Sequence, residues 1–165
     1  GGSQGSPAQM VYFDEFFKKY KGVFSWHDRL QREAITFKRV TTATGRQFDF
    51  PDCERQRNGT ASFKTQIVNY PVQSVATAEI VPLGVILLFN KMKEMGLRSK
   101  VINTVHDSVL IDTHPEELAI VKQIGPKCLL DAQREALDRF GLDTYIPLDV
   151  EMSLGKNWME QEDFA

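Results

Sequence analysis

Cysteine and histidine are scarce in this chain of 165 residues, which contains two cysteines and three histidines. Cys53 and Cys128 lie far apart, and neither has a second cysteine at the spacing that metal sites use. A structural zinc site needs such clusters, so the sequence argues against one. We interpret both thiols as buried and free in a reducing cytoplasm; a disulfide between them is an alternative with no support.

Long hydrophobic runs are also absent. The longest nearly unbroken apolar run, residues 80–89, is too short to span a bilayer and contains Pro82 and Gly84. It therefore predicts a buried helix, and we expect neither a membrane segment nor a membrane partner. A hydrophobic content of 42% is enough to bury one core, so we expect a single domain or a compact part of a larger protein.

The formal net charge of −2 hides an uneven distribution. Residues 29–64 contain eight lysines or arginines and four acidic residues, whereas residues 131–165 contain nine acidic and three basic residues. The basic stretch is suited to phosphates and the acidic end would repel them. Many proteins have one basic face and bind no nucleic acid, so this pattern alone does not assign a ligand.

Periodicity predicts a fold of several helices with a few antiparallel strands, which is the α+β class. After a flexible GGSQGS segment (1–6), the first half of the chain is expected to form a helix from Ser6 to about Gly22, a helix over 25–37, a hairpin over 38–52 that turns at Gly45, and a polar loop over 53–62. A long helix should then run from about Asn69 to Met95, with Pro82 kinking or dividing it, and a hairpin with strands at 101–105 and 109–112 should follow. The last expected elements are a helix from Pro115 to Phe140 that Gly125-Pro126 interrupts and a strand at about 148–152.

The hairpin NTVHDSVLID (103–112) is unusual because it holds a carboxylate, Asp107, at its bend. A solvated aspartate in a turn explains this pattern without any function, and the stretch by itself favours that interpretation.

Three collinear stretches change this interpretation. TGRQFDFPD (44–52) with NYPVQSVATAEI (69–80) resembles the GR-containing fingers hairpin and the N-x-P-x-Q helix of family A DNA polymerases, the group of bacterial DNA polymerase I and its bacteriophage relatives. INTVHDSVLI (102–111) is similar to the HD-centred palm motif C of that family, and IPLDVEMSLGKNW (146–158) resembles its terminal palm strand. YFDEFFKKYKGV (12–23) also resembles the family's Y-F-x-x-Y-P-G-V helix, with Lys21 in place of proline. The resemblance implies that residues 7–165 form a C-terminal fingers and palm portion.

The resemblance implies a template-directed nucleotidyl transfer that uses two Mg²⁺ ions, with primer-template DNA and dNTP as substrates. Asp107 then becomes a catalytic metal ligand, and His106 a catalytic residue that contacts the primer strand near its end. Magnesium accepts one or two carboxylates together with phosphate oxygens and water, which suits a single aspartate on a stiff hairpin.

The same resemblance assigns DNA contacts to four further residues. Asn69 and Gln73 are four residues apart on one helical face, and the resemblance places their amides against minor-groove acceptors that all base pairs share. Arg46 and Lys64 are implied to contact DNA as well. Without the resemblance, a capping residue and an exposed polar position would explain Asn69 and Gln73.

Some positions depart from the family pattern. Ser108 stands where members commonly have a glutamate, and Thr65 stands where many bacterial members have an arginine that contacts DNA. Asp149 and Glu151 flank the terminal strand, where a solvated strand edge explains them equally well.

The sequence contains no counterpart of motif A, which carries the second metal-binding aspartate, or of motif B, the helix that grips the triphosphate. One carboxylate cannot organise two metal ions, so we expect the chain to be inactive alone and to need a complementary polypeptide that carries motifs A and B. Two alternatives remain open at this point. One is a non-catalytic, polymerase-derived binding or structural module; the other is an unrelated α+β domain with accidental likeness.

Overall fold

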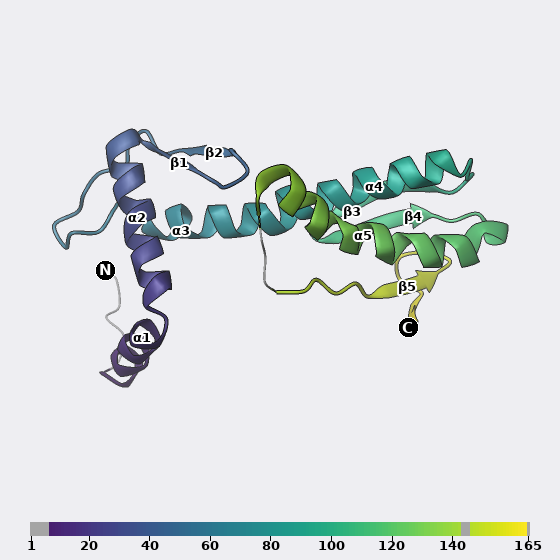
Figure 1. Ribbon diagram of the computed structural model, residues 1–165. Coiled ribbons are helices and arrows are strands. Elements are labelled where there is room, and N and C mark those ends of the chain that lie inside the picture. The colour runs from purple at the N-terminus through teal and green to yellow at the C-terminus, as the bar shows by residue number, and fades with distance from the viewer. Residues whose placement is uncertain (1–6, 143–145, 165) are drawn as a thin grey trace. The chain divides into compact units, whose positions relative to one another are not determined.

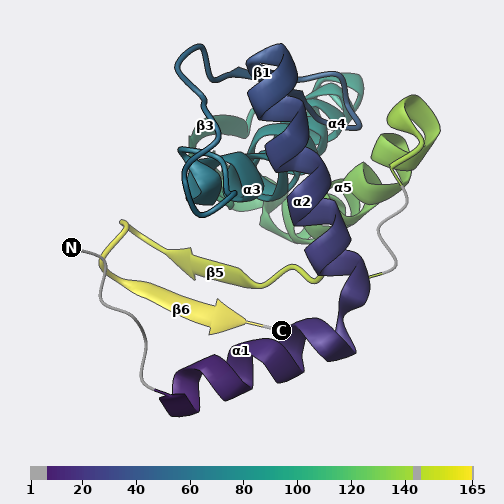
Figure 2. The same cartoon turned by 90° about the vertical axis from the view of Figure 1, so that its left-hand side faces the viewer.

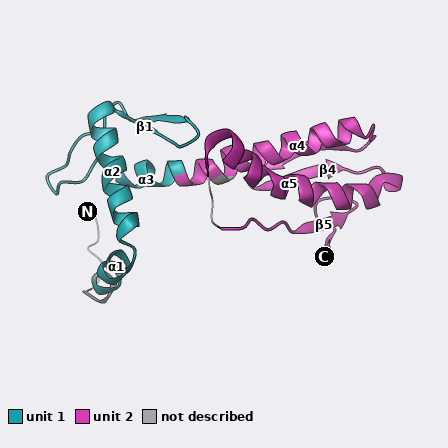
Figure 3. Cartoon of the chain, viewed as in Figure 1, with its two compact units in different colours: residues 1–71 teal, residues 72–165 magenta. Residues whose placement is uncertain are grey.

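The computed structural model describes residues 7–142 and 146–164 (Figure 1). The chain forms two compact units, one of residues up to Pro71 and one of residues from Val72 onward (Figure 3). The described strands pair as three antiparallel hairpins among the helices, which confirms the α+β class. Segment 1–6, with Ser6 at the predicted start of the first helix, lies outside the described residues.

Two helices begin the first unit. Helix α1 spans Pro7–Lys19 and α2 spans Lys21–Phe37. The first helix therefore ends before the predicted Gly22, which instead lies in the first turn of α2, and the second begins earlier than the predicted Ser25. Pro7 begins α1, where a backbone N–H would have no acceptor within the helix, so the missing N–H of proline costs no hydrogen bond there. Lys38, with a left-handed φ of 55°, ends α2.

The predicted hairpin follows directly and is confirmed. Strand β1 (Arg39–Thr41) pairs with β2 (Gln47–Asp49), and Gly45 takes a φ of +85° in the turn between them. The core of this unit gathers apolar side chains of α2, the hairpin, the following loop and α3, namely Leu30, Ala34, Val40, Phe50, Cys53, Ala61 and Ile67. Cys53 is buried and free, as expected.

Residues 53–62 form the predicted polar loop, although its two ends are anchored. Arg55 and Ala61 form an isolated antiparallel bridge, and the Ala61 N–H donates to Gln31 Oε1 of α2 at 3.1 Å. The Lys38 ammonium donates to the Cys53 carbonyl. The loop is therefore held against α2 by hydrogen bonds as well as by the buried Cys53 and Ala61.

A long helical run leads from the first unit into the second. It consists of α3 (Lys64–Gln73), a π-helical segment η1 (Ser74–Ile80) and α4 (Val81–Glu94). Asn69 lies inside α3 and is not its cap, because the helix already begins after Phe63, whose φ is 61°. Pro82 stands at the start of α4, where its missing N–H and its ring end the preceding π-helical pattern. The predicted division at Pro82 is not found, because the helical run is continuous from Lys64 to Glu94 and only its type changes, from π-helix to α-helix, between Ile80 and Val81.

The whole run, Lys64–Glu94, is long and apolar enough by length and composition to cross a membrane. Core helices of soluble proteins pass the same test. Only 18% of its most apolar window is buried: in α4, Leu88 and Met92 lie in the core of the second unit, whereas Ile86 and Phe89 are exposed.

The second unit packs the hairpin of β3 (Lys100–Val105) and β4 (Ser108–Asp112) with α4 and α5 (Leu118–Phe140) (Figure 1). Leu88 and Met92 of α4 meet Ile124 and Cys128 of α5, and apolar hairpin residues pack against this cluster: Val101, Val109 and Ile111. A short 3-10 turn, η2 (Pro115–Glu117), precedes α5.

Helix α5 continues through Gly125-Pro126, so the predicted interruption there is wrong. Ile124, Gly125 and Cys128 are all buried on the face that packs in the core, and this packing outweighs the cost of a proline that lacks an N–H. Gly141, with φ of 63°, ends the helix.

The C-terminal strand prediction is shifted. Strand β5 covers Met152–Gly155 instead of 148–152, and it pairs antiparallel with β6 (Gln161–Phe164), which the sequence did not predict (Figure 2). The GKNW residues begin the turn between them, where the Asn157 side chain accepts from the Met159 and Glu160 N–H groups at 2.9 and 3.1 Å.

Candidate functional site

Asp107 and His106 form the two-residue turn of the β3–β4 hairpin. Val105 pairs with Ser108, so these two residues alone connect the strands. His106 has a φ of 55°, the positive value that the first position of a tight hairpin turn requires, and histidine adopts it more readily than most residues. Both side chains are exposed. The hairpin therefore projects a carboxylate and an imidazole into solvent.

Ser108 fastens this turn. Its hydroxyl donates to the Val105 carbonyl at 2.8 Å, across the two turn residues. The residue that departs from the family pattern therefore has a structural role here. Val101, Val109 and Ile111 of the hairpin pack against the core that α4 and α5 form. A rigid base and a bonded turn limit the motion of Asp107, which is what a positioned ligand needs.

The residues predicted to contact DNA lie on other elements. Asn69 and Gln73 are both in α3, four positions apart and exposed, so they share one face as predicted. Arg46 is exposed in the β1–β2 turn and donates its N–H to Thr42 Oγ1 at 3.1 Å. Lys64 is the exposed first residue of α3. The first unit contains Arg46, Lys64 and Asn69, and the second unit contains Gln73, His106 and Asp107.

Asp107 fits magnesium as one oxygen ligand among several. Among the residues that the structure describes, no group of three or more His, Cys, Asp or Glu side chains is arranged to hold a metal ion. Magnesium needs few protein carboxylates when phosphate oxygens and water complete its shell. The hairpin can thus supply one ligand, and the remaining ligands must come from substrate and from other residues.

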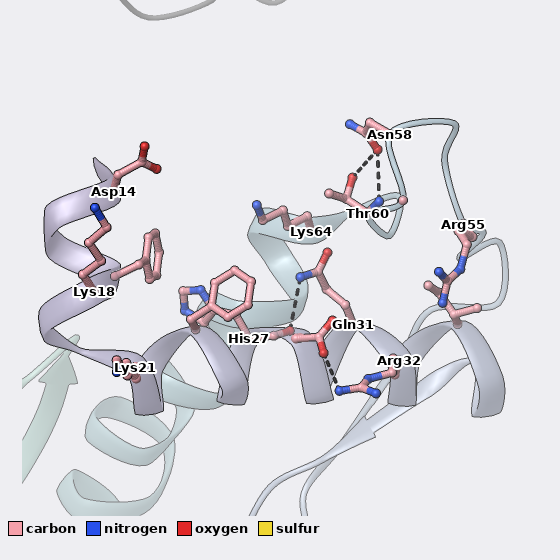
Figure 4. Close-up of a pocket in the computed structure, with 15 residues that line it drawn as sticks. Asp14, Lys18, Lys21, His27, Gln31, Arg32, Arg55, Asn58, Thr60 and Lys64 are labelled. Carbon is pink, nitrogen blue, oxygen red and sulfur yellow. Dashed lines mark hydrogen bonds and ion pairs between the residues drawn. The ribbon is translucent and has the colours of Figure 1, made fainter. Parts of the chain in front are cut away.

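The structure also shows a pocket that the sequence did not reveal. It lies in the first unit between α1, α2, the 53–62 loop and the start of α3, and its volume is about 640 Å³. Charged and polar side chains surround it (Figure 4), among them Lys18, Lys21, His27, Gln31, Asn58 and Lys64. The basic stretch of the sequence was the only available signal, and it did not indicate that α1 contributes to the same space.

A family model matches most of the chain. The model of DNA polymerase family A covers residues 5–160. DNA polymerase I of Aquifex aeolicus is 28% identical over 150 residues, 90% of this chain and 23% of that protein. DNA polymerase I of Caldicellulosiruptor bescii is 31% identical over 90% of this chain and 16% of that protein. The DNA polymerase of Bacillus phage SP01 is 26% identical, also over 90% of this chain and 16% of that protein. The chain thus spans a quarter or less of the length of these relatives.

A solved structure has the same fold. The POL domain of Pol1 from M. smegmatis, in complex with DNA primer-template and dNTP, matches with a TM-score of 0.63 and 24% identity, over 74% of this chain and 22% of that one. This likeness supports the α+β fold of a polymerase domain. The family match over residues 5–160 shows that the chain belongs to DNA polymerase family A.

Proposed function

We propose that this chain supplies the motif C portion of a DNA-directed DNA polymerase. The observation that carries the proposal is the β3–β4 turn, which presents Asp107 on a bonded, exposed tip in a chain that the family A model matches over residues 5–160. In this proposal residues 7–165 are the fingers and palm portion of the enzyme, and Asp107 is a catalytic carboxylate.

The proposed substrates are primer-template DNA and dNTP. The relatives are DNA polymerases, and the structural neighbour is a complex with both substrates. His106 would meet the primer end from its place beside Asp107. Asn69 and Gln73, exposed on one face of α3, would donate to minor-groove acceptors, while Arg46 and Lys64 would contact phosphates.

The proposed cofactor is Mg²⁺. When bound, a pair of such ions stabilises the attacking and leaving oxygens of nucleotidyl transfer. The part that this chain plays is to hold Asp107 as an oxygen ligand in a fixed position. The packed base of the hairpin and the Ser108–Val105 bond provide that fixation.

The second metal-binding carboxylate must come from residues outside this sequence, because motifs A and B have no counterpart in its 165 residues. We infer that a complementary polypeptide that carries these motifs completes the active site. Its helix with the triphosphate-binding lysine would hold dNTP, and this chain alone would not extend a primer.

Primer extension by a mixture of the purified chain and a polypeptide carrying motifs A and B tests the proposal. We expect the mixture to extend a primer in Mg²⁺. Asp107→Asn should reduce kcat by roughly a thousandfold, the scale on which removing a group that stabilises the transition state acts. Asp112→Asn is the matched control, since Asp112 is an exposed aspartate at the opposite end of the same hairpin. It should retain the activity of the unmodified chain.

Two outcomes would contradict the proposal. Extension that survives Asp107→Asn would remove the catalytic role of the turn and would favour a non-catalytic module that binds DNA or a replication protein. Full extension by this chain alone would remove the need for a complementary polypeptide. Circular dichroism on both variants would confirm that the fold is intact, so that loss of activity reports on the carboxylate.

A further inference from the structure

The pocket of the first unit is cationic. Five lysine and arginine side chains line it against two carboxylates, Asp14 and Asp28. Arg32, one of the five, pairs with Asp28 on α2. The other four have no ion pair with any residue that the structure describes: Lys18, Lys21, Arg55 and Lys64. Like charges around one space create a positive potential, so the pocket attracts acidic groups.

The same pocket offers apolar surface. Helix α2 lies between Lys18 of α1 and the loop that carries Arg55, and it forms the floor of the pocket (Figure 4). Phe17 of α1 and Phe24 of α2 both line this space, with ring centroids 5.8 Å apart, and Phe24 is 59% exposed. An inorganic anion would use only the cations. A ligand that fits the whole pocket combines carboxylates with large apolar side chains.

The β5–β6 hairpin of the second unit has that combination. Its turn presents Trp158, which is 54% exposed, and Met159, which is 94% exposed. The turn is fixed because the Met159 N–H donates to Asn157 Oδ1 at 2.9 Å. Glu162 and Asp163 follow in β6; both are exposed, and neither has an ion pair within the described part of the chain. Exposed apolar side chains rimmed by polar ones are typical of a protein–protein contact.

We propose that the β5–β6 hairpin of one copy of this chain docks in the cationic pocket of a second copy. Trp158 and Met159 lie against Phe24 in this contact, and Glu162 and Asp163 face the unpaired basic side chains. The charges of the whole chain favour the same pairing, because residues 29–64 carry eight basic and four acidic residues, whereas residues 131–165 carry three and nine. Charge complementarity sets the orientation, and the buried aromatic side chains supply most of the affinity.

Sedimentation velocity of the complete chain measures this association, in a buffer that contains neither nucleic acid nor metal ion. We expect the sedimentation coefficient to rise with protein concentration up to roughly several hundred micromolar, since a contact of one hairpin with one pocket falls in the small, weak class of interfaces. The association should weaken when sodium chloride rises from about 0.05 M to about 0.5 M, because salt screens the attraction between opposite charges. A monomer at every concentration in low salt would overturn the proposal.

Charge reversal on either surface should prevent the association. Lys18→Glu with Arg55→Glu places acidic groups in the pocket, and Glu162→Lys with Asp163→Lys places basic groups on the hairpin, so each variant alone should stay monomeric. Mixed together, the two variants should form a one-to-one pair, because the first keeps an intact hairpin and the second keeps an intact pocket. Formation of this pair also shows that both variants are folded. A mixture that remains monomeric would overturn the proposal.

Matched controls separate this contact from general charge effects. Lys93→Glu with Lys127→Glu makes the same change in net charge at exposed helix positions of the second unit, and it should leave self-association unchanged. Trp158→Ser should weaken association roughly tenfold or more, the scale of a central aromatic anchor, whereas Phe37→Ser, at an exposed ring outside the pocket, should not. Equal losses in the controls would contradict the proposal. The assay involves neither DNA nor catalysis, so its outcome is independent of the test of Asp107.

Discussion

Glu117 shows how one side chain can tie separate elements together. Its carboxylate accepts hydrogen bonds from Ser99 Oγ at 2.6 Å and from the N–H groups of Ser99 and Arg98 at 2.8 and 2.9 Å. These contacts fasten the chain before β3 to the turn before α5. The Ser99 hydroxyl bond is the main reason that the pKa of Glu117 falls from 4.5 to about 2, with the two backbone donors next.

This carboxylate should make the stability of the chain depend on pH. A folded-state pKa below the unfolded value means that the stabilising contribution is complete above about pH 4.5 and is lost as the pH falls toward about 2. Glu117→Gln should lower the melting temperature at pH 6, and the difference from the unmodified chain should shrink steadily between these two pH values. Thermal unfolding followed by circular dichroism at several pH values measures this difference.

Glu116 provides the matched control for Glu117. It pairs with the same Arg98, but its side chain is 76% exposed, whereas that of Glu117 is 13% exposed. An exposed pair contributes little to stability, so Glu116→Gln should change the melting temperature by far less. A pH-independent difference for Glu117→Gln would show that its carboxylate is not the group responsible.

The contact between α4 and α5 depends on a glycine. A Cβ at Gly84 would lie 2.8 Å from Leu129 Cδ2 and 3.2 Å from Leu129 Cα, so a larger residue would force the helices apart. From the sequence, Gly84 served only as an argument against a membrane-spanning segment. Its role follows from the close approach of a helix that is distant in sequence.

Gly84→Ala should therefore destabilise the second unit by about 1–3 kcal/mol, the usual cost of overpacking. Gly22→Ala is the natural comparison, because Gly22 also lies in a helix but has nothing within 4 Å of its Cβ position. There alanine should stabilise by up to about 1 kcal/mol through helix propensity. Chemical denaturation of both variants measures the two signs, and a stabilising Gly84→Ala would contradict the packing argument.

At the scale of the whole molecule, the chain has separate hydrophobic cores. Val40 is fully buried in the core of the first unit, and Leu88 is fully buried in the second, where it meets α5. Among the residues that the structure describes, none belongs to both clusters. The uneven charge of the sequence follows the same division, since the basic stretch 29–64 lies wholly in the first unit and the acidic stretch 131–165 wholly in the second.

Separate cores predict separate responses to mutation. Leu88→Ala should cost about 2–5 kcal/mol, the usual penalty for a cavity in a core. Hydrogen exchange followed by mass spectrometry should then show faster exchange in α4, α5 and the β3–β4 hairpin, with little change in β1 and β2. Val40→Ala should give the reverse pattern at a smaller cost. Uniform acceleration across both units in either variant would mean that they unfold as one.

Local signals in the sequence determined much of the fold. The hairpins around Gly45 and around His106-Asp107 and the α+β class follow from glycine, turn residues and the period of apolar residues. The motifs at 44–52, 69–80, 102–111 and 146–158 indicated the family, because side chains that act in chemistry are specified by type and spacing.

Only the tertiary structure decided the rest. Packing of Ile124 and Cys128 carries α5 through Pro126, contacts across the chain give Glu117 its low pKa, and pairing with an unexpected β6 places β5 at Met152–Gly155. The cationic pocket likewise exists only because α1, α2 and the loop with Arg55 meet in space. Each of these features depends on groups that are distant in the sequence, and no local pattern carries that information.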